Sequence, residues 1–443
     1  MRFVVLVALL AACGSHPNGG RGDDAGNGAM DGGGNGDAGD DGGGLSDAGL
    51  DDGGDDADIT PDAPPMDTVA PYEIVAGGGH MCSVRDSTLR CWGLNDLGQL
   101  GIASTVTCSN EACTKTPAIV LSNVTKVALG QRATCAIRGD KTLWCFGDDR
   151  QRQLGLTPTG LCDGSNACVP APTQVPNITG VIDVAVGTTH SCIVLDTGVV
   201  QCTGSNSVGE MGNGTTAPNN TFAAVPGITT AIAVRIGQNF ACALLADHTL
   251  SCWGHNLIGQ LGRGNMNCTT CTSASPVVGL SDVRQFSLGS AYGCAVREDL
   301  GVWCWGSNQI NQSGGGTQVC TGVSCNMTPR RIPGHFAFEV KTGFEHACSR
   351  NVDGMTSSCW GSDFAGQLGI QPFPTDCSGI HPCAGTPRLV TGTANNRRLA
   401  LGDGFSCALA ADGTGQCWGN NAMAQFGDGS TLEALTPLAV TTW

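Results

Sequence analysis

Short apolar stretches separated by turn residues recur along the chain from about residue 72. One clear copy has apolar stretches at 232–237, 240–245 and 249–254, then Gly259-Gln-Leu-Gly262 and, after a loop, Pro276-Val-Val. Each stretch has strand length, Gly, Asn or Asp separates neighbouring stretches, and no window sustains a helical period. The pattern predicts β-strands, four to a unit.

The units repeat, because two cysteines nine to eleven residues apart recur seven times, usually with Trp-Gly behind the second. The pairs are Cys82 with Cys91, Cys135 with Cys145, Cys192 with Cys202, Cys242 with Cys252, Cys294 with Cys304, Cys348 with Cys359, and Cys407 with Cys417. Seven units of four short strands predict an all-β fold, a seven-bladed β-propeller over residues 71–443. A linear solenoid is the alternative, but it needs capping repeats, and neither terminal copy has a capping character.

The two ends of the repeat region predict how the ring closes. If each unit is written to begin with its Pro-x-x-Val strand, the chain starts one strand late, at 72–77, and ends with a surplus strand at 437–443. We therefore expect the C-terminal strand to pair with the N-terminal one, which closes the propeller and removes exposed sheet edges.

The unit resembles the repeat of a known family. Cys-Ala-Leu, followed by Leu-x-Cys-Trp-Gly-x-Asn-x-x-Gly-Gln-Leu-Gly, resembles the repeat of the regulator of chromosome condensation family, which are seven-bladed propellers. The best copies are 82–101, 242–262, 348–369 and 407–427, whereas the third unit departs at Cys202-Thr-Gly204. The resemblance covers residues 72–443 and implies the fold. The family's guanine nucleotide exchange on a small GTPase is not expected to transfer, because fold does not carry function.

The cysteine count predicts a disulfide framework. Of 25 cysteines, fourteen form the repeat pairs, which face each other across hairpins. Ten more form five short pairs: Cys108 with Cys113, Cys162 with Cys168, Cys268 with Cys271, Cys320 with Cys325, and Cys377 with Cys383. Regular, even spacing indicates disulfides and hence an oxidising compartment. Cys268 and Cys271 have the spacing of half a zinc site, which would need a second pair close by; a loop bridge is favoured.

The odd cysteine, Cys13, falls on an export signal. Residues 1–12 carry one positive charge and an apolar run too short to span a bilayer, which is typical of a signal peptide. The run ends in Leu10-Ala-Ala-Cys13, which resembles the lipobox of bacterial lipoproteins. The resemblance implies that Cys13 is acylated and anchors the chain to the membrane. We expect a bacterial envelope lipoprotein, at the outer membrane or cell surface.

Residues 13–70 are expected to follow the anchor as a disordered Gly/Asp-rich tether. Residues 14–70 contain 17 Gly and 14 Asp, leaving little to bury. This segment holds most of the formal net charge of −16, so the repeat region is nearly balanced. No basic stripe with interleaved aromatic residues occurs, and nucleic-acid binding is therefore not expected.

Two recurring residue types could be sites, and packing explains both better. Trp92, Trp253, Trp305, Trp360 and Trp418 occupy one place in their repeats, which predicts packing between blades. His80, His190 and His346 stand two residues before a repeat cysteine and could converge on a metal. The matching residues elsewhere are Ala133, Phe240, Tyr292 and Phe405, which favours a packing slot. No catalytic signature or cofactor motif stands out.

These observations predict a lipid-anchored, exported propeller that acts as a non-catalytic binding head for protein or cell-surface glycan partners. The loops pinned by short cysteine pairs are expected to share one face, where rigidity lowers the entropic cost of binding. Two alternatives stay open. One is a polysaccharide hydrolase or lyase with its site at the central channel, which carboxylates gathered at one channel mouth would favour; the other is a purely structural envelope protein.

Overall fold

The computed structural model describes residues 72–104, 106–162, 164–316, 318–373, 382–393 and 395–440, in which every regular element is a β-strand. No apolar helix of membrane-crossing length is found in this part of the chain. The predicted signal peptide, Cys13 and the tether lie outside the described residues, as do Cys377 and Trp443.

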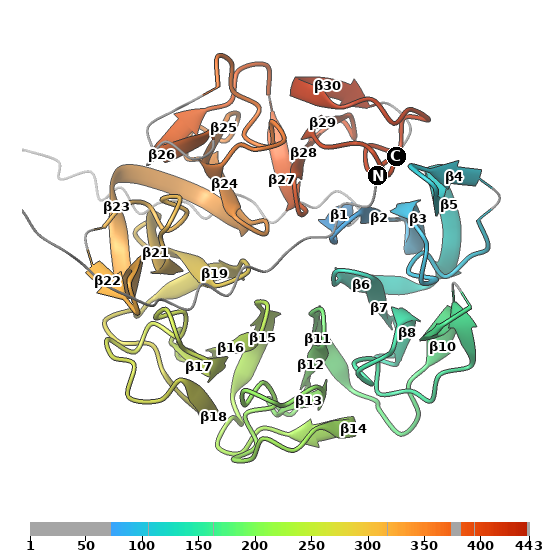
Figure 1. Cartoon of the computed structure of the whole chain (residues 1–443), viewed down its shortest axis with the longest axis horizontal. Coiled ribbons are helices and arrows are strands. Elements are labelled where there is room, and N and C mark those ends of the chain that lie inside the picture. Colours follow the sequence, from blue (N-terminus) through green and yellow to red (C-terminus); the bar gives the residue numbers. More distant parts are fainter. Residues whose placement is uncertain are drawn as a thin grey trace, which may run out of the picture. The chain divides into compact units, whose positions relative to one another are not determined.

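The strands form antiparallel sheets of four or five strands, and one of eight strands that spans two blades. The sheets radiate from a common centre (Figure 1), which confirms the propeller fold. Innermost lie β1 (Glu73–Ala76), β6 (Val124–Leu129), β11 (Val181–Val186), β15 (Ala231–Ile236), β19 (Val283–Leu288), the end of β23 (Val323–Thr342) and β27 (Asn396–Leu401). Second come β2 (His80–Arg85), β7 (Ala133–Arg138), β12 (His190–Leu195), β16 (Phe240–Leu245), β20 (Tyr292–Arg297), β24 (His346–Asn351) and β28 (Phe405–Ala410).

The third strands carry the second repeat cysteines, and the outer strands complete each sheet. The third strands are β3 (Thr88–Leu94), β8 (Leu143–Asp148), β13 (Val200–Gly204), β17 (Leu250–His255), β21 (Gly301–Ser307), β25 (Ser357–Ser362) and β29 (Gly415–Gly419). The outer strands are β5 (Glu111–Ser122), β10 (Asn166–Gln174), β14 (Asn219–Ala224), β18 (Thr270–Pro276), the start of β23, β26 (Cys383–Leu389) and β30 (Ala434–Val440). Because β23 serves as both an outer and an inner strand, the fifth and sixth blades share one continuous sheet.

The predicted pairing of the terminal strands is wrong. β30 pairs with β29 of its own repeat, and β1 pairs with β2, so the first and last strands belong to different sheets. In each blade the chain runs from the inner strand to the outer Pro-x-x-Val strand. The structural unit therefore begins at its inner strand, and β1 is the first strand of a complete blade. The seam is closed instead by side-chain packing and isolated hydrogen bonds, such as that from the Gly429 N–H to the Lys115 carbonyl at 3.0 Å. Ile74, Met81 and Trp92 of the first blade share one apolar core with Phe405 and Phe426 of the last.

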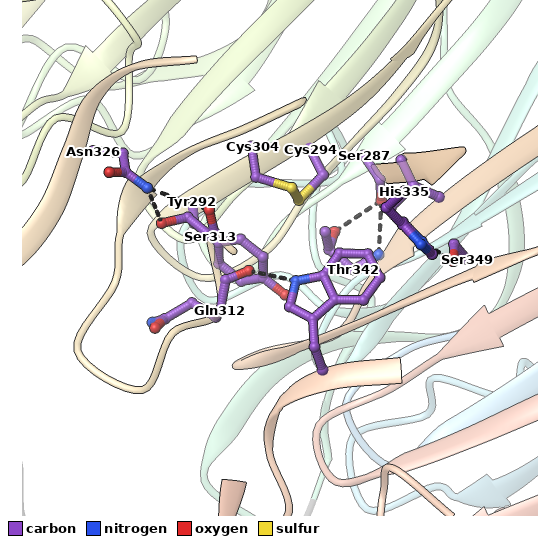
Figure 2. The surroundings of a disulfide bond; sticks show 12 residues. Ser287, Tyr292, Cys294, Cys304, Gln312, Ser313, Asn326, His335, Thr342 and Ser349 are labelled. Carbon is purple, nitrogen blue, oxygen red and sulfur yellow. Dashed lines mark hydrogen bonds between the residues drawn. A yellow bond between two sulfur atoms is a disulfide. The ribbon is translucent and has the colours of Figure 1, made fainter. Parts of the chain in front are cut away.

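Neighbouring blades are joined by the recurring tryptophans, whose packing role the sequence predicted. Each indole is fully buried, and its Nε1 donates to the backbone carbonyl of the Gln or Glu in the Gly-Gln-Leu-Gly turn of the preceding blade. The bonds are Trp92–Gln425, Trp253–Glu210, Trp305–Gln260, Trp360–Gln312 and Trp418–Gln367, at 2.8–3.1 Å. Figure 2 shows the carbonyl of Gln312 in this role beside the Cys294–Cys304 disulfide. The Trp92–Gln425 bond spans the seam.

The residue two positions after each repeat Trp-Gly (or its equivalent) ties the turn together. In all seven blades its Oδ1 accepts a hydrogen bond from the backbone N–H five residues on. In five blades this residue is Asn, and in four of these Nδ2 also donates to the following loop, as Asn256 does to the Asn265 carbonyl at 3.1 Å. Asp149 and Asp363 replace it in the second and sixth blades, and their buried Oδ2 atoms lack a hydrogen-bond partner. Burial raises the pKa of each carboxyl to about 6.

We predict that Asp149→Asn and Asp363→Asn each raise the thermal midpoint at pH 7.5. The folded state holds a proton on these carboxyls that the unfolded chain has already lost, so stability falls as pH rises from about 4 to about 6. An Asn supplies the missing donor, and each variant should gain about 1 kcal/mol or more. Thermal unfolding at pH 5 and pH 7.5 measures this, and the gain should be larger at pH 7.5.

Asn256→Asp is the matched reverse substitution and should introduce the same loss of stability at pH 7.5. A gain from Asp149→Asn that is equal at the two pH values would contradict the assignment.

Candidate functional site

One face of the propeller carries the irregular loops. The first and third strands of every sheet run antiparallel to the second, so both end on the same side. Three kinds of segment come directly after those strand ends: the inner-strand glycines, the Gly-Gln-Leu-Gly turns and the hairpins with the short cysteine pairs. We call this side the loop face. The topology thus places the pinned loops on one side, as the repeat pattern predicts.

The repeat cysteines lie directly opposite each other in the register of the second and third strands, as Cys82 does to Cys91. The structure joins all seven pairs as disulfides, with Cα atoms 4.0–4.1 Å apart. These bridges are Cys82–Cys91, Cys135–Cys145, Cys192–Cys202, Cys242–Cys252, Cys294–Cys304, Cys348–Cys359 and Cys407–Cys417. Each therefore staples the two middle strands of its own blade, as the spacing of the cysteines predicted.

The structure also joins four of the five short pairs. These bridges are Cys108–Cys113, Cys162–Cys168, Cys268–Cys271 and Cys320–Cys325. Cys383 is described but Cys377 is not, so the fifth short bridge stays a prediction. Because Cys268 and Cys271 bond to each other, they are not half of a zinc site. The described residues contain no group of three His, Cys, Asp or Glu that could hold a metal.

Two of the pinned hairpins have the same construction. β4 (Val106–Cys108) pairs with β5, and β22 (Gln318–Cys320) pairs with β23, each through a two-residue turn whose central residues both have positive φ. Such turns follow the twist of a hairpin. The turn hydroxyl of Ser109 donates to the Ala422 carbonyl at 3.2 Å, and that of Thr321 to the Leu257 carbonyl at 3.5 Å. Each hairpin therefore rests on the turn of the preceding blade.

The pinned hairpins hold apolar side chains in solvent. Leu161 of β9 (Gly160–Cys162) and Val319 of β22 each precede a bridged cysteine, and each is 65% exposed. Val106 of β4 is 44% exposed. Because they are held on bridged hairpins, these side chains could meet a protein partner with little further ordering.

A recess opens on the loop face beside the channel mouth, between the fifth, sixth and seventh blades. It encloses about 560 Å³ and is lined by Ile310, Phe344, Phe364 and three carboxylates, Glu345, Asp403 and Glu433. We call it the carboxylate pocket. Phe364 is 74% exposed and so presents apolar surface to the recess.

Asp403 stands where the carboxylate pocket meets the channel mouth. Gln131 Nε2 donates to its Oδ2 at 2.6 Å, across the first blade, where Gly78 has no side chain to intervene. Asp403 remains partly exposed to solvent, but protein atoms surround its carboxyl on most sides. The resulting desolvation raises the pKa of Asp403 to about 6. The neighbouring Glu345 carboxylate adds to the increase.

The centre of the channel is occupied by ion pairs. Lys126 Nζ lies 2.6 Å from Asp183 Oδ1, and an Arg235 guanidinium nitrogen lies 2.9 Å from Oδ2. Burial alone would raise the pKa of Asp183, but the two cations hold it below its ordinary value. Asp183 also accepts a hydrogen bond from the Val234 backbone N–H at 2.8 Å. Its interactions therefore join three inner strands, which is a structural role.

The three histidines do not form a site. His80 and His346 are buried between blades, where their Nε2 atoms lie 2.9 Å from the hydroxyls of Thr134 and Ser406 on the next blade. Opposite His190, the corresponding residue of the next blade is Ala241, which has no hydroxyl. Both ring nitrogens of His190 therefore lack a hydrogen-bond partner. Burial lowers the pKa of His190 to about 4, so the ring is neutral. A packing slot describes all three.

Sequence reasoning missed the carboxylate pocket. Its three carboxylates lie at positions where the repeat is variable, and no motif connects them. A signal was available in the residue that follows each inner-strand glycine, which is small or uncharged in six blades and Asp403 in the seventh. The spatial proximity of Glu345, Asp403 and Glu433 could not be read without the fold.

Comparison with known proteins agrees with the repeat pattern. Two family models, both described as the regulator of chromosome condensation (RCC1) repeat, match residues 140–194 in one case and 124–153 and 181–210 in the other. The X-linked retinitis pigmentosa GTPase regulator homolog of Caenorhabditis elegans is 35% identical over 32% of this chain and 10% of its own length. Protein pim1 of Schizosaccharomyces pombe is 30% identical over 31% of this chain and 28% of its own. The chain thus spans less than a third of either relative.

Solved structures extend the likeness to the whole repeat region. Yeast RCC1 (Prp20), solved bound to Kap60, is 19% identical with a TM-score of 0.69, and the match covers 84% of each chain. Human WBSCR16 is 21% identical with a TM-score of 0.65, over 80% of this chain and 94% of that one. At these identities the likeness establishes the fold alone.

We predict that His190→Phe stabilises the protein and reduces its sensitivity to acid. Phe240 and Phe405 fill the same slot in other blades, and the change removes two unpartnered buried nitrogens, worth about 1–3 kcal/mol. Because the folded pKa is depressed, wild-type stability is lost as pH falls below about 6.5. Thermal midpoints at pH 7 and pH 5 should show a gain that is larger at pH 5.

His346→Phe is the matched control, because it sacrifices the bond to Ser406 and should gain less. A His190→Phe variant that unfolds at a lower temperature than the wild type would disprove the assignment.

Proposed function

Because the chain is a β-propeller of RCC1-type repeats, we propose that it is an exported, lipid-anchored and non-catalytic binding head whose loop face recognises a protein partner. The observation that carries this proposal is the set of apolar side chains held in solvent on pinned hairpins, Leu161 and Val319 above all. Fixing such residues before binding removes part of the ordering cost of association. Yeast Prp20, a propeller of this fold, has been solved bound to Kap60.

The location rests on the sequence. An apolar leader that ends at Cys13, followed by Gly/Asp-rich residues to about position 70, supports export, acylation and a spacer between the membrane and the propeller. An oxidising compartment agrees with the pairing of the described cysteines. Titration of the native protein with a thiol reagent under denaturing conditions should find no free sulfhydryl.

We predict that Leu161→Ser and Val319→Ser together weaken capture of the partner in a pull-down from the native envelope. Each removes apolar area that is exposed in the free protein, so folding should be unaffected, while the complex loses about 1 kcal/mol or more per residue. Ile119→Ser is the matched control, because Ile119 is 66% exposed but lies on the outer strand β5. Equal capture by the double variant and the control would count against the loop face.

The short disulfides allow a second test of the same surface. Replacing Cys162 and Cys168 by Ser frees the β9 hairpin but leaves the seven repeat bridges intact. The β circular-dichroism spectrum should be preserved, and capture should weaken because the hairpin must now be ordered on binding.

The carboxylate pocket favours a second candidate, a polysaccharide hydrolase or lyase. With a pKa of about 6, Asp403 is partly protonated near neutral pH, which suits a general acid, and Glu345 is a second carboxylate nearby. A cleavage screen of the purified protein on envelope polysaccharides tests this, with Asp403→Asn as the inactive control. Product that disappears in that variant would establish the enzyme and displace the binding head.

A further inference from the structure

We propose that the carboxylate pocket receives a lysine or arginine side chain from a protein partner. The inference rests on the proposed function, because it names the chemistry that the loop face recognises. It follows from three features of the pocket: a lining with carboxylates but no cation, exposed aromatic walls, and a position at the channel mouth.

The first feature is a local imbalance of charge. None of the thirteen residues that line the pocket is Lys, Arg or His, and three are Glu or Asp. Two other carboxylates of the loop face have cationic partners from this chain: Arg132 pairs with Asp96, and Arg150 approaches Asp148 at 2.7 Å. Within the described residues Asp403 has only a neutral amide, that of Gln131, as its hydrogen-bond partner. A positively charged guest would supply the missing charge.

The second feature selects a long, flat or aliphatic cation. Phe344, Phe364 and Ile310 give the pocket apolar walls, with the Phe364 ring 74% exposed. Lysine and arginine bury their methylene stems on such surfaces while the charged end reaches a carboxylate. A guanidinium also stacks on aromatic faces. A neutral sugar would use the rings but would leave the negative charge of the lining unchanged.

The third feature concerns size and access. A volume of about 560 Å³ lies within the range of small-ligand sites, about 300–1,000 Å³. The pocket opens on the loop face, where the pinned hairpins are also presented. A protein that lies across the hairpins can therefore insert a side chain without any movement of the blades. The raised pKa of Asp403 agrees with a site that lacks its cation, and occupation should lower it.

The test uses the full chain and two synthetic peptides, acetyl-Gly-Gly-Arg-Gly-Gly-amide and its citrulline counterpart, which keeps the shape but lacks the charge. Calorimetric titration at low salt should show the arginine peptide binding about tenfold more tightly or better. Asp403→Asn with Glu345→Gln should reduce its affinity about tenfold, and Phe364→Ala severalfold. Affinity should fall at pH 5.5, where Asp403 is largely protonated, and with added salt.

Phe364→Ala keeps the test valid if the charge variants fold poorly, because Phe364 is mostly exposed. Glu298→Gln, an exposed carboxylate on the opposite face, is the matched control and should bind as the wild type does. Equal binding of both peptides, or retention by the double variant, overturns the inference. So does binding of a neutral chitooligosaccharide in place of the peptides.

The envelope pull-down separates the two proposals. If a partner is captured equally by the wild type and by the double variant of Asp403 and Glu345, the pocket inference fails and the binding head stands. If the arginine peptide binds as expected but the envelope yields no partner, the proposed function fails while the pocket retains its chemistry.

Discussion

The structure depends on one repeated interaction, the hydrogen bond from a buried indole to the backbone carbonyl of the preceding blade. A sheet in a propeller shares no ladder with its neighbours unless a strand runs through both, as β23 does. Blades are therefore held together largely by side chains, with isolated backbone hydrogen bonds such as that from the Gly78 N–H to the Gly130 carbonyl at 3.2 Å. Trp92 extends this bond to Gln425 across the seam, where packing and further hydrogen bonds, such as Ser109 to the Ala422 carbonyl, also close the ring. Gly427 makes the approach possible, because a Cβ there would meet the Trp92 ring at 2.6 Å.

A ring fastened in this way leaves one face free to vary. The tryptophans and the repeat disulfides are buried, and four of the five buried turn Asn residues donate to backbone carbonyls of the loops between third and outer strands. The side chains of those loops can therefore change without disturbing the scaffold. The short disulfides then restore rigidity to those loops. In the first and fifth blades the hairpins also lean on the preceding turn through Ser109 and Thr321. The same hairpins thus brace the ring and present apolar residues to solvent.

Much of the fold could be predicted because it repeats. Strand length and the opposition of Cys82 and Cys91 follow from a local pattern copied seven times, and the packing of the indoles follows from a position that is Trp in five of the copies. The closure was predicted wrongly, because a periodic sequence does not state where a sheet begins; only the pairing of β30 with β29 fixes the phase. The carboxylate pocket could not be predicted as a site, although the charge of Asp403 at a position that is uncharged in the other six repeats could be read from the sequence. The pocket is formed by residues of three blades, and its carboxylates occupy positions that differ from one repeat to the next. The period of the repeat does not indicate which of these residues lie close together.

The departures from the repeat have two different physical meanings. Asp149 and Asp363 stand at the buried turn position that is Asn in the other blades. Their carboxyls lower the stability of the fold, and substitution by Asn should restore it. Asp403 also has a raised pKa, but it faces an open recess with Glu345 and Phe364, where a molecule from outside can supply what the chain does not. Burial alone therefore does not distinguish a structural defect from a binding site. The distinction lies in whether the group can be reached from outside, and Asp403 meets that condition beside an exposed aromatic side chain.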